Sequence, residues 1–182
     1  EFVWHDYCDW YLELSKPLLE NKKTQQGCEA TLFKVLSETL ILLHPIIPFI
    51  TEEIFEQCQG LINNSTERLI SHSFPETDSS LIDAKAESEI LWLKEFILGI
   101  RQIRGEMNIA PGKPLPCFVQ DLNKLDKTYI KNSKSIIFTL AKLQSIELLS
   151  KGDEEPESAI ALVGKMKILI PLAGLIDKDQ EI

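Results

Sequence analysis

The sequence predicts a mainly helical protein that ends in a small α+β unit: an antiparallel helix bundle followed by a compact β-α-β-β-β subdomain. Two observations predict this fold. Apolar residues recur at spacings of three and four in long segments up to about residue 108, the period of amphipathic helices. Beyond residue 111 the apolar runs shorten to strand length, apart from one amphipathic helix. We therefore expect a bundle over 1–110, a subdomain over 111–172, and the start of another helix at 173–182.

Two helices open the predicted bundle. The first is expected over residues 2–16, where Val3, Tyr7, Trp10 and Leu14 share one face, with Pro17 near its end and at most a short continuation to residue 20. The second is expected over residues 27–43. Apolar residues cover so much of its circumference that we expect it to be central and largely buried.

A corner follows, with the sequence Leu-Leu-His-Pro-Ile-Ile-Pro-Phe-Ile-Thr-Glu-Glu at 42–53. Pro45 disfavours helical dihedrals at His44, whereas Pro48 suits the first turn of a new helix. We expect that third helix over 48–59, with Glu52 and Glu53 complementing the dipole at its start. Four apolar side chains are available to plug a core here: Ile46, Ile47, Phe49 and Ile50.

The rest of the chain contains one long loop, one long helix and the mixed unit. Residues 61–83 are rich in Asn, Ser, Thr and Pro and predict a surface loop. Residues 84–108 predict the fourth bundle helix. We then expect strands at 115–120, 145–149, 159–163 and 166–172, with a helix at 125–143 after the first of them.

Composition restricts the classes of function. The 182 residues carry a formal charge of −9, which argues against a protein that coats DNA or RNA, although a local basic patch remains compatible with it. Four scattered cysteines form no CxxC pair, so a zinc knuckle or redox motif is not supported and a reduced, cytoplasmic setting fits best. No apolar run approaches the ~20 residues that span a bilayer. We expect a monomer that binds neither DNA nor membrane.

The sequence offers no self-contained active site. His5 and Cys8 are three residues apart on one helix, but two ligands without a third make a poor metal site. Gly164-Lys165 lacks the preceding glycine of a phosphate loop. Since no nucleophile–base pair is identifiable either, we expect no catalytic residue, no bound metal and no cofactor in this chain.

The stretch 101–114, Arg-Gln-Ile-Arg-Gly-Glu-Met-Asn-Ile-Ala-Pro-Gly-Lys-Pro, is the most informative one. Guanidinium groups bind phosphate in a bidentate manner and stack on bases, and an amide can read a base edge. The alternative is that these cations complement a helix C-terminus or pair with carboxylates. The candidate RNA-binding residues are Arg101, Arg104, Asn108 and Lys113, together with Lys16 at the end of the first helix.

Three stretches resemble known proteins. His-Pro-Ile-Ile-Pro-Phe-Ile-Thr-Glu-Glu at 44–53 resembles the helix corner in the anticodon-binding bundle of class I aminoacyl-tRNA synthetases for aliphatic amino acids. That motif leaves the valine, isoleucine and leucine enzymes open. Residues 2–16 and Ile-Arg-Gly-Glu-Met-Asn-Ile-Ala-Pro-Gly-Lys at 103–113 resemble the valyl-tRNA synthetase family of bacterial type, in the same order along the chain.

This resemblance implies a division of labour within a longer enzyme. The nucleotide-binding catalytic domain and the domain that edits mischarged threonine would lie outside this chain, and ATP and Mg²⁺ would be used there. The family's bundle begins about one helix before Glu1, and 173–182 resembles the first turns of its C-terminal coiled-coil arm. The implied partner is the anticodon stem-loop of valine tRNA. Three aromatic residues are stacking platforms or core residues: Trp4, Trp10 and Tyr11.

Two other interpretations remain open. The chain could be the equivalent region of isoleucyl-tRNA synthetase, or a helical protein–protein interaction module with no RNA role, which the acidic charge favours. A positive strip around Arg101, Arg104 and Lys113 would favour RNA, whereas an exposed apolar groove would favour a protein partner. No motif supports a stand-alone hydrolase or ligase.

Overall fold

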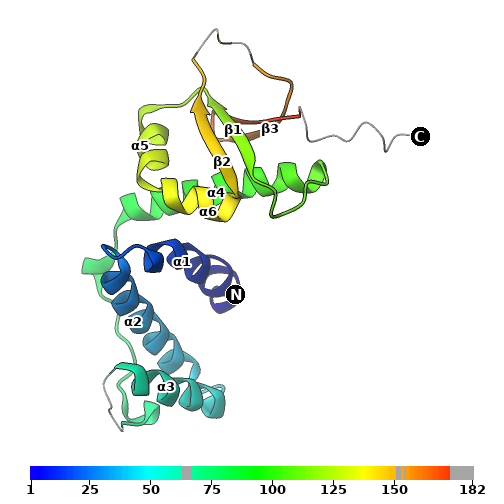
Figure 1. Ribbon diagram of the computed structural model, residues 1–182. Helices are drawn as coiled ribbons and strands as arrows, with labels where there is room; N and C mark the ends of the chain where they lie inside the picture. Colours follow the sequence, from blue (N-terminus) through cyan, green and yellow to red (C-terminus); the bar gives the residue numbers. More distant parts are fainter. Residues whose placement is uncertain (63–66, 151–152, 154, 173–182) are drawn as a thin grey trace. The chain divides into compact units, whose positions relative to one another are not determined.

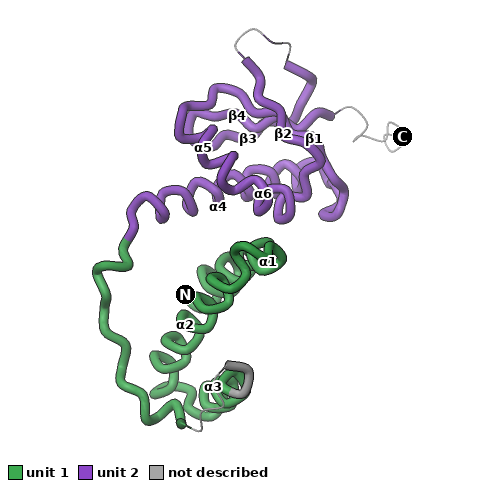
Figure 2. Tube along the Cα trace, turned by 60° about the vertical axis from the view of Figure 1, so that its left-hand side comes forward, with its two compact units in different colours: residues 1–82 green, residues 83–182 purple. Residues whose placement is uncertain are grey.

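The chain divides into two compact units, residues 1–82 and 83–182 (Figure 2). The computed structural model describes residues 1–62, 67–150, 153 and 155–172. Within these ranges six α-helices accompany a four-stranded mixed sheet, which confirms the predicted fold class. The expected helix start at 173–182 lies outside the described residues.

The described residues of the first unit form helices joined by loops. Its elements are the π-helical segment η1 (Phe2–Tyr11), the α-helices α1 (Leu12–Glu20), α2 (Gln25–Leu43) and α3 (Pro48–Ile62), and the short 3-10 turns η2 (Leu69–Ser71) and η3 (Ser79–Leu81). Pro17 does not end the first helix. It is buried inside α1, and the helix continues to Glu20.

A small core holds α2, α3 and η2 together. Leu40, Phe55 and Leu69 are buried in one cluster. Leu69 comes from the predicted surface loop, and its N–H donates to Glu52 Oε1 of α3 at 3.1 Å, which fixes η2 against that helix. The prediction that α2 is largely buried is wrong, because only Thr39 and Leu40 of that helix are buried.

A break between α2 and α3 forms as predicted, but its apolar residues face outward. His44 keeps helical dihedrals, with φ of −54° and ψ of −39°, contrary to the effect expected from Pro45. His44 Nδ1 lies 2.9 Å from the hydroxyl oxygen of Thr51, which is 1% exposed and also donates to the Ile47 carbonyl. The helix α3 turns Thr51, Ile54 and Phe55 inward. The corner's apolar residues lie outside that face and plug no core, contrary to expectation: Ile46 is 77%, Ile47 43%, Phe49 91% and Ile50 52% exposed.

The second unit is a sheet with helices on one face (Figure 1). Its elements are α4 (Ala84–Glu106), β1 (Leu115–Gln120), α5 (Lys124–Asn132), α6 (Lys134–Ala141), β2 (Leu143–Leu148), β3 (Ser158–Val163) and β4 (Met166–Pro171). The strand order is β2-β1-β4-β3; β1 and β2 are parallel, and β4 is antiparallel to β1 and β3. The single helix expected at 125–143 is two helices that meet at Ser133.

Helix α4 packs along this sheet (Figure 1). Leu93, Phe96, Ile97, Ile100 and Ile103 are 0–1% exposed. At Gly99 an added Cβ would lie only 3.2 Å from Ala161 Cβ of β3, so glycine permits the close approach of helix and strand. The bundle expected over 1–110 includes this helix, whereas the division at residue 82 groups it with the sheet that its apolar face covers.

Candidate functional site

The last turn of α4 sets the direction of the chain at the candidate site. The Ile109 N–H donates to the Arg104 carbonyl at 2.8 Å, and the Asn108 N–H donates to the Gly105 carbonyl at 3.3 Å. Asn108 has φ of 50°, in the left-handed region. This is a Schellman ending, in which asparagine is one of the few non-glycine residues that is readily tolerated. The position of Asn108 therefore has a structural cause of its own.

Arg104 is buried beneath this turn, 7% exposed. Its Nη1 donates to the Ala110 carbonyl at 3.1 Å, and its Nη2 donates to the carbonyls of Lys113, Ala141 and Lys142 at 2.8, 3.0 and 2.9 Å. Burial lowers the pKa of the guanidinium. Arg104 thus joins the end of α4, the following loop and the α6–β2 junction, and its guanidinium is committed to main-chain carbonyls.

These three segments enclose a pocket of about 620 Å³. The end of α4 and its loop supply Arg101, Arg104, Gly105, Asn108, Ile109 and Pro111, and the α6–β2 junction supplies Leu140 and Lys142. Three of the lining residues carry positive charge and none carries a carboxylate, although the chain as a whole has a formal charge of −9. Such a lining attracts anions.

The predicted candidates do not all meet at this pocket. Arg101, Arg104 and Asn108 line it together. Lys113 is exposed in the adjoining turn and contributes its carbonyl to Arg104. Lys16 belongs to the first unit, where its Nζ lies 2.6 Å from Glu13 Oε1.

Lys142 is the site residue that sequence reasoning missed. It follows the last residue of α6 with φ of 51°, in the left-handed region where glycine is usual. The helix expected at 125–143 placed Lys142 inside the helix, whereas α6 ends at Ala141. The approach of Lys142 to Arg104, which lies 38 residues earlier in the chain, was not visible in the sequence.

The chain matches one known family over most of its length. Residues 1–121 of 182 match the family model described as the anticodon-binding domain of tRNA ligase. The chain belongs to this family. It is therefore a tRNA-binding domain of the aminoacyl-tRNA synthetases. Lys142 lies beyond the matched residues. The four predicted candidates of the second unit lie within them: Arg101, Arg104, Asn108 and Lys113.

A second pocket in the same unit of this anticodon-binding domain has the opposite charge. It measures about 570 Å³ and its lining includes Glu95, Asp121 and Asp126 with only Lys165 as a cation. Asp126 Oδ1 accepts from Trp92 Nε1 at 3.0 Å, and Asp126 also completes the capping box of α5 with Asn123. Asp126 thus stabilises the fold locally, and the three carboxylates make the pocket unsuitable for RNA phosphate.

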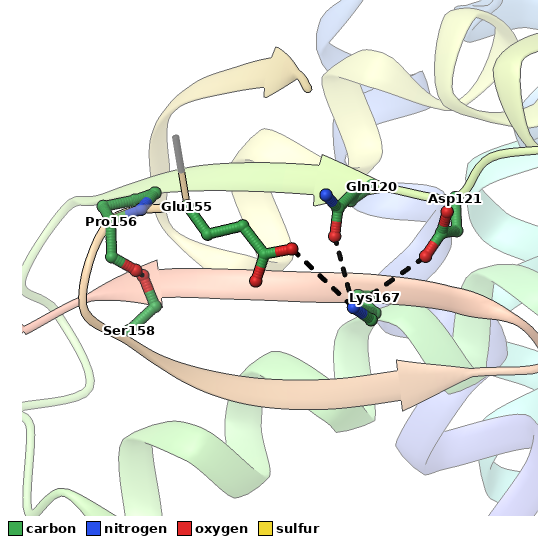
Figure 3. Close-up of polar contacts among 6 residues, drawn as sticks. All are labelled: Gln120, Asp121, Glu155, Pro156, Ser158 and Lys167. Carbon is green, nitrogen blue, oxygen red and sulfur yellow. Dashed lines mark hydrogen bonds and ion pairs between the residues drawn. The ribbon is translucent and has the colours of Figure 1, made fainter. Parts of the chain in front are cut away.

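Lys167 of β4 is likewise unsuited to binding an anion in this domain. Its Nζ lies 3.9 Å from Asp121 Oδ2, 3.8 Å from Glu155 Oε1 and 3.4 Å from Gln120 Oε1 (Figure 3). Two carboxylates neutralise this lysine, and Gly164 at the preceding hairpin turn has φ of 58°. The Lys-Met-Lys run at 165–167 is thus a hairpin element.

The aromatic residues near the N-terminus differ in exposure. Trp4 is 69% exposed, while Trp10 and Tyr11 are half-buried and the Tyr7 and Tyr11 rings lie 5.6 Å apart. Among the residues that the structure describes, no group of three or more His, Cys, Asp or Glu side chains is arranged to hold a metal ion. In the same residues, no helix is long and apolar enough to cross a membrane.

Proposed function

We propose that this chain is the tRNA anticodon-binding region of a bacterial-type valyl-tRNA synthetase. The family match supports tRNA binding. The valine assignment is supported by 2–16 and 103–113, the two stretches that resemble valyl enzymes. The second of these stretches contains the end of α4 and the turn that build the cationic pocket, so the sequence signature and the candidate site coincide.

In the proposed enzyme this domain positions tRNA and does no chemistry. Holding the anticodon end in a fixed orientation delivers the acceptor end to a distant active site, where valine is activated with ATP and Mg²⁺. Selectivity arises because the bases of a single-stranded loop can be splayed apart, stacked and hydrogen-bonded. We further propose that the enzyme is a cytoplasmic monomer.

The test is binding of the 182-residue chain to labelled anticodon stem-loops by fluorescence anisotropy at several salt concentrations. The panel contains the valine stem-loop, the same stem-loop with its middle anticodon base changed, and the isoleucine stem-loop. We expect weak, salt-dependent binding with a preference of about tenfold for the valine sequence, equivalent to about 1.4 kcal/mol. Equal affinity for all three would contradict anticodon reading, and a preference for the isoleucine stem-loop would replace the valine assignment.

One observation favours a second function, a protein–protein interaction module. The corner exposes a contiguous run of apolar residues, with Phe49 at 91% and Ile46 at 77%. Exposed apolar patches of this kind mark interaction surfaces. A domain with only this function would bind none of the three stem-loops, even at low salt, where electrostatic attraction is strongest.

A further inference from the structure

The pocket at the end of α4 has features of a built anion site. Its positive charges come from two distant parts of the chain, Arg101 and Arg104 on α4 and Lys142 after α6. Hydrogen bonds from the buried Arg104 guanidinium tie these parts together, so the pocket does not have to assemble when a ligand arrives. Preorganised charge of this kind binds a ligand with less loss of conformational entropy.

The three cations have different roles. The Nη atoms of Arg104 donate to main-chain carbonyls, so this residue contributes charge at the base of the pocket and holds its walls. The side chains of Arg101 and Lys142 are exposed at the same pocket and can contact an anion directly. The exposed Asn108 amide adds a neutral donor.

Three hydrogen bonds hold the backbone at Lys142. Its N–H donates to the Phe138 carbonyl, and its own carbonyl accepts from Arg104 Nη2 at 2.9 Å and from the Leu115 N–H at 3.1 Å. The position therefore keeps φ of 51°, a conformation that is unfavourable for lysine and unstrained for glycine. The ammonium group extends from a rigid base, and removing it as Lys142→Gly leaves every main-chain hydrogen bond intact.

The residues that line the pocket also favour a phosphate over a base as its ligand. Recognition of a splayed base uses an aromatic or guanidinium plane for stacking. No aromatic residue lines this pocket, and one of its two guanidinium groups, that of Arg104, is committed to carbonyls. The other polar side chains are Arg101, Lys142 and one amide, so positive charge outweighs stacking surface. This set matches phosphate oxygens, which accept several charge-assisted hydrogen bonds at once.

We infer that this pocket binds a backbone phosphate of the RNA, with Arg101 and Lys142 as the contacting cations and Arg104 as the positioning residue. The inference rests on the proposed tRNA-binding function and adds to it. In this inference the pocket fixes the register and orientation of the RNA, whereas other residues discriminate between bases.

The experiment measures the salt dependence of stem-loop binding by the 182-residue chain. The variants are Lys142→Gly, Lys142→Gln and Arg101→Gln, with Lys127→Gln as the matched control, an exposed lysine of α5 outside the pocket lining. The slope of log K against log salt is negative, and each pocket substitution should reduce its magnitude by about 0.7, the value for one single-strand phosphate contact. Affinity should fall about three- to tenfold for every sequence alike, since a phosphate contact carries no base information.

The Lys142→Gly variant separates binding from folding. Its thermal midpoint should equal or exceed that of the unaltered chain, because the substitution relieves a left-handed backbone strain. Lys127→Gln should leave the salt slope unchanged. If all lysine variants reduce the magnitude of the slope equally, or if Lys142→Gly leaves it unchanged while the unaltered chain binds RNA, the pocket assignment is overturned.

Titration with inorganic phosphate, followed by the amide NMR signals of Gly105, Asn108 and Lys142, distinguishes the sources of the phosphate. Shifts that disappear in Lys142→Gly, together with the slope change, support an RNA phosphate. Shifts in a chain whose RNA binding is insensitive to Lys142→Gly would assign the pocket to free phosphate and overturn the inference. Failure of every stem-loop to bind would instead contradict the proposed function itself.

Discussion

Replacing Arg104 with alanine should destabilise the second unit more than any other single change at the candidate site. The guanidinium of this 7%-exposed residue donates to four carbonyls, of which the bond to Ala141 is buried and the other three are partly buried. Net values are about 1.5–3 kcal/mol for a buried bond to a charged donor and about 0.5–1 kcal/mol for each bond that water can replace. The expected loss in free energy of unfolding is therefore about 3–6 kcal/mol.

Two further substitutions separate the contributions. Arg104→Met keeps most of the aliphatic side chain but none of the donors. Its loss in free energy of unfolding should therefore differ from that of the alanine variant by no more than about 1 kcal/mol. Arg104→Lys restores the charge, but the lysine ammonium is compact and has only three N–H donors. It cannot reach all four carbonyls that the planar guanidinium contacts. Lysine should recover less than half of the loss.

The assay is urea unfolding in a background that carries Trp4→Phe and Trp10→Phe, so that Trp92 on α4 is the only indole. Linear extrapolation gives the free energy of unfolding of the second unit. Hydrogen exchange at the Leu115 amide, which donates to the Lys142 carbonyl at 3.1 Å, gives a local reading of the junction. A loss below about 1 kcal/mol in Arg104→Ala, with unchanged exchange at Leu115, would refute the bracing role.

Three further predictions follow from the packing and the polar contacts. Gly99→Ala should destabilise the second unit by about 1 kcal/mol in the same urea assay, because its Cβ would approach the sheet to 3.2 Å. Gly105→Ala should stabilise the unit by about 0.5 kcal/mol, because no atom lies within 4 Å of the added Cβ; a gain in stability at both positions would contradict the packing argument. Thr51→Val should destabilise the first unit by about 1–2 kcal/mol, measured by circular dichroism, because it removes a 1%-exposed hydroxyl from the corner histidine; an unchanged midpoint would count against this role. Burial raises the pKa of Cys117 to about 12, so at pH 8 a disulfide reagent should label exposed Cys8 rapidly and Cys117 only on unfolding. Equal labelling of both cysteines in the native chain would show that Cys117 is accessible. Because the pKa of this thiol is higher in the folded than in the unfolded chain, its contribution to stability should be constant at neutral pH. That contribution should decline above about pH 8.5, the pKa of an unfolded thiol.

Local patterns in the sequence determined most of the secondary structure. Apolar spacing predicted the long helices, because a helix exposes one face per turn over many residues. Short apolar runs between turn signals located all four strands to within two residues. The two prolines predicted the break between α2 and α3, although His44 keeps helical dihedrals before Pro45. The anticodon-binding family could also be identified from the sequence, because each motif that resembles the family is a contiguous stretch.

Only the tertiary structure decided how these elements use their side chains. Arg104 and Asn108 read alike as polar residues at a helix end, yet one is buried under carbonyls that lie up to 38 residues away and the other caps the helix at the surface. Lys142 enters the pocket because β2 runs parallel to β1, which brings the α6–β2 junction beside the start of β1 at Leu115. Burial and charge clustering depend on such long-range pairings. Periodicity reports only which residues share a face, and it carries no information on what that face meets.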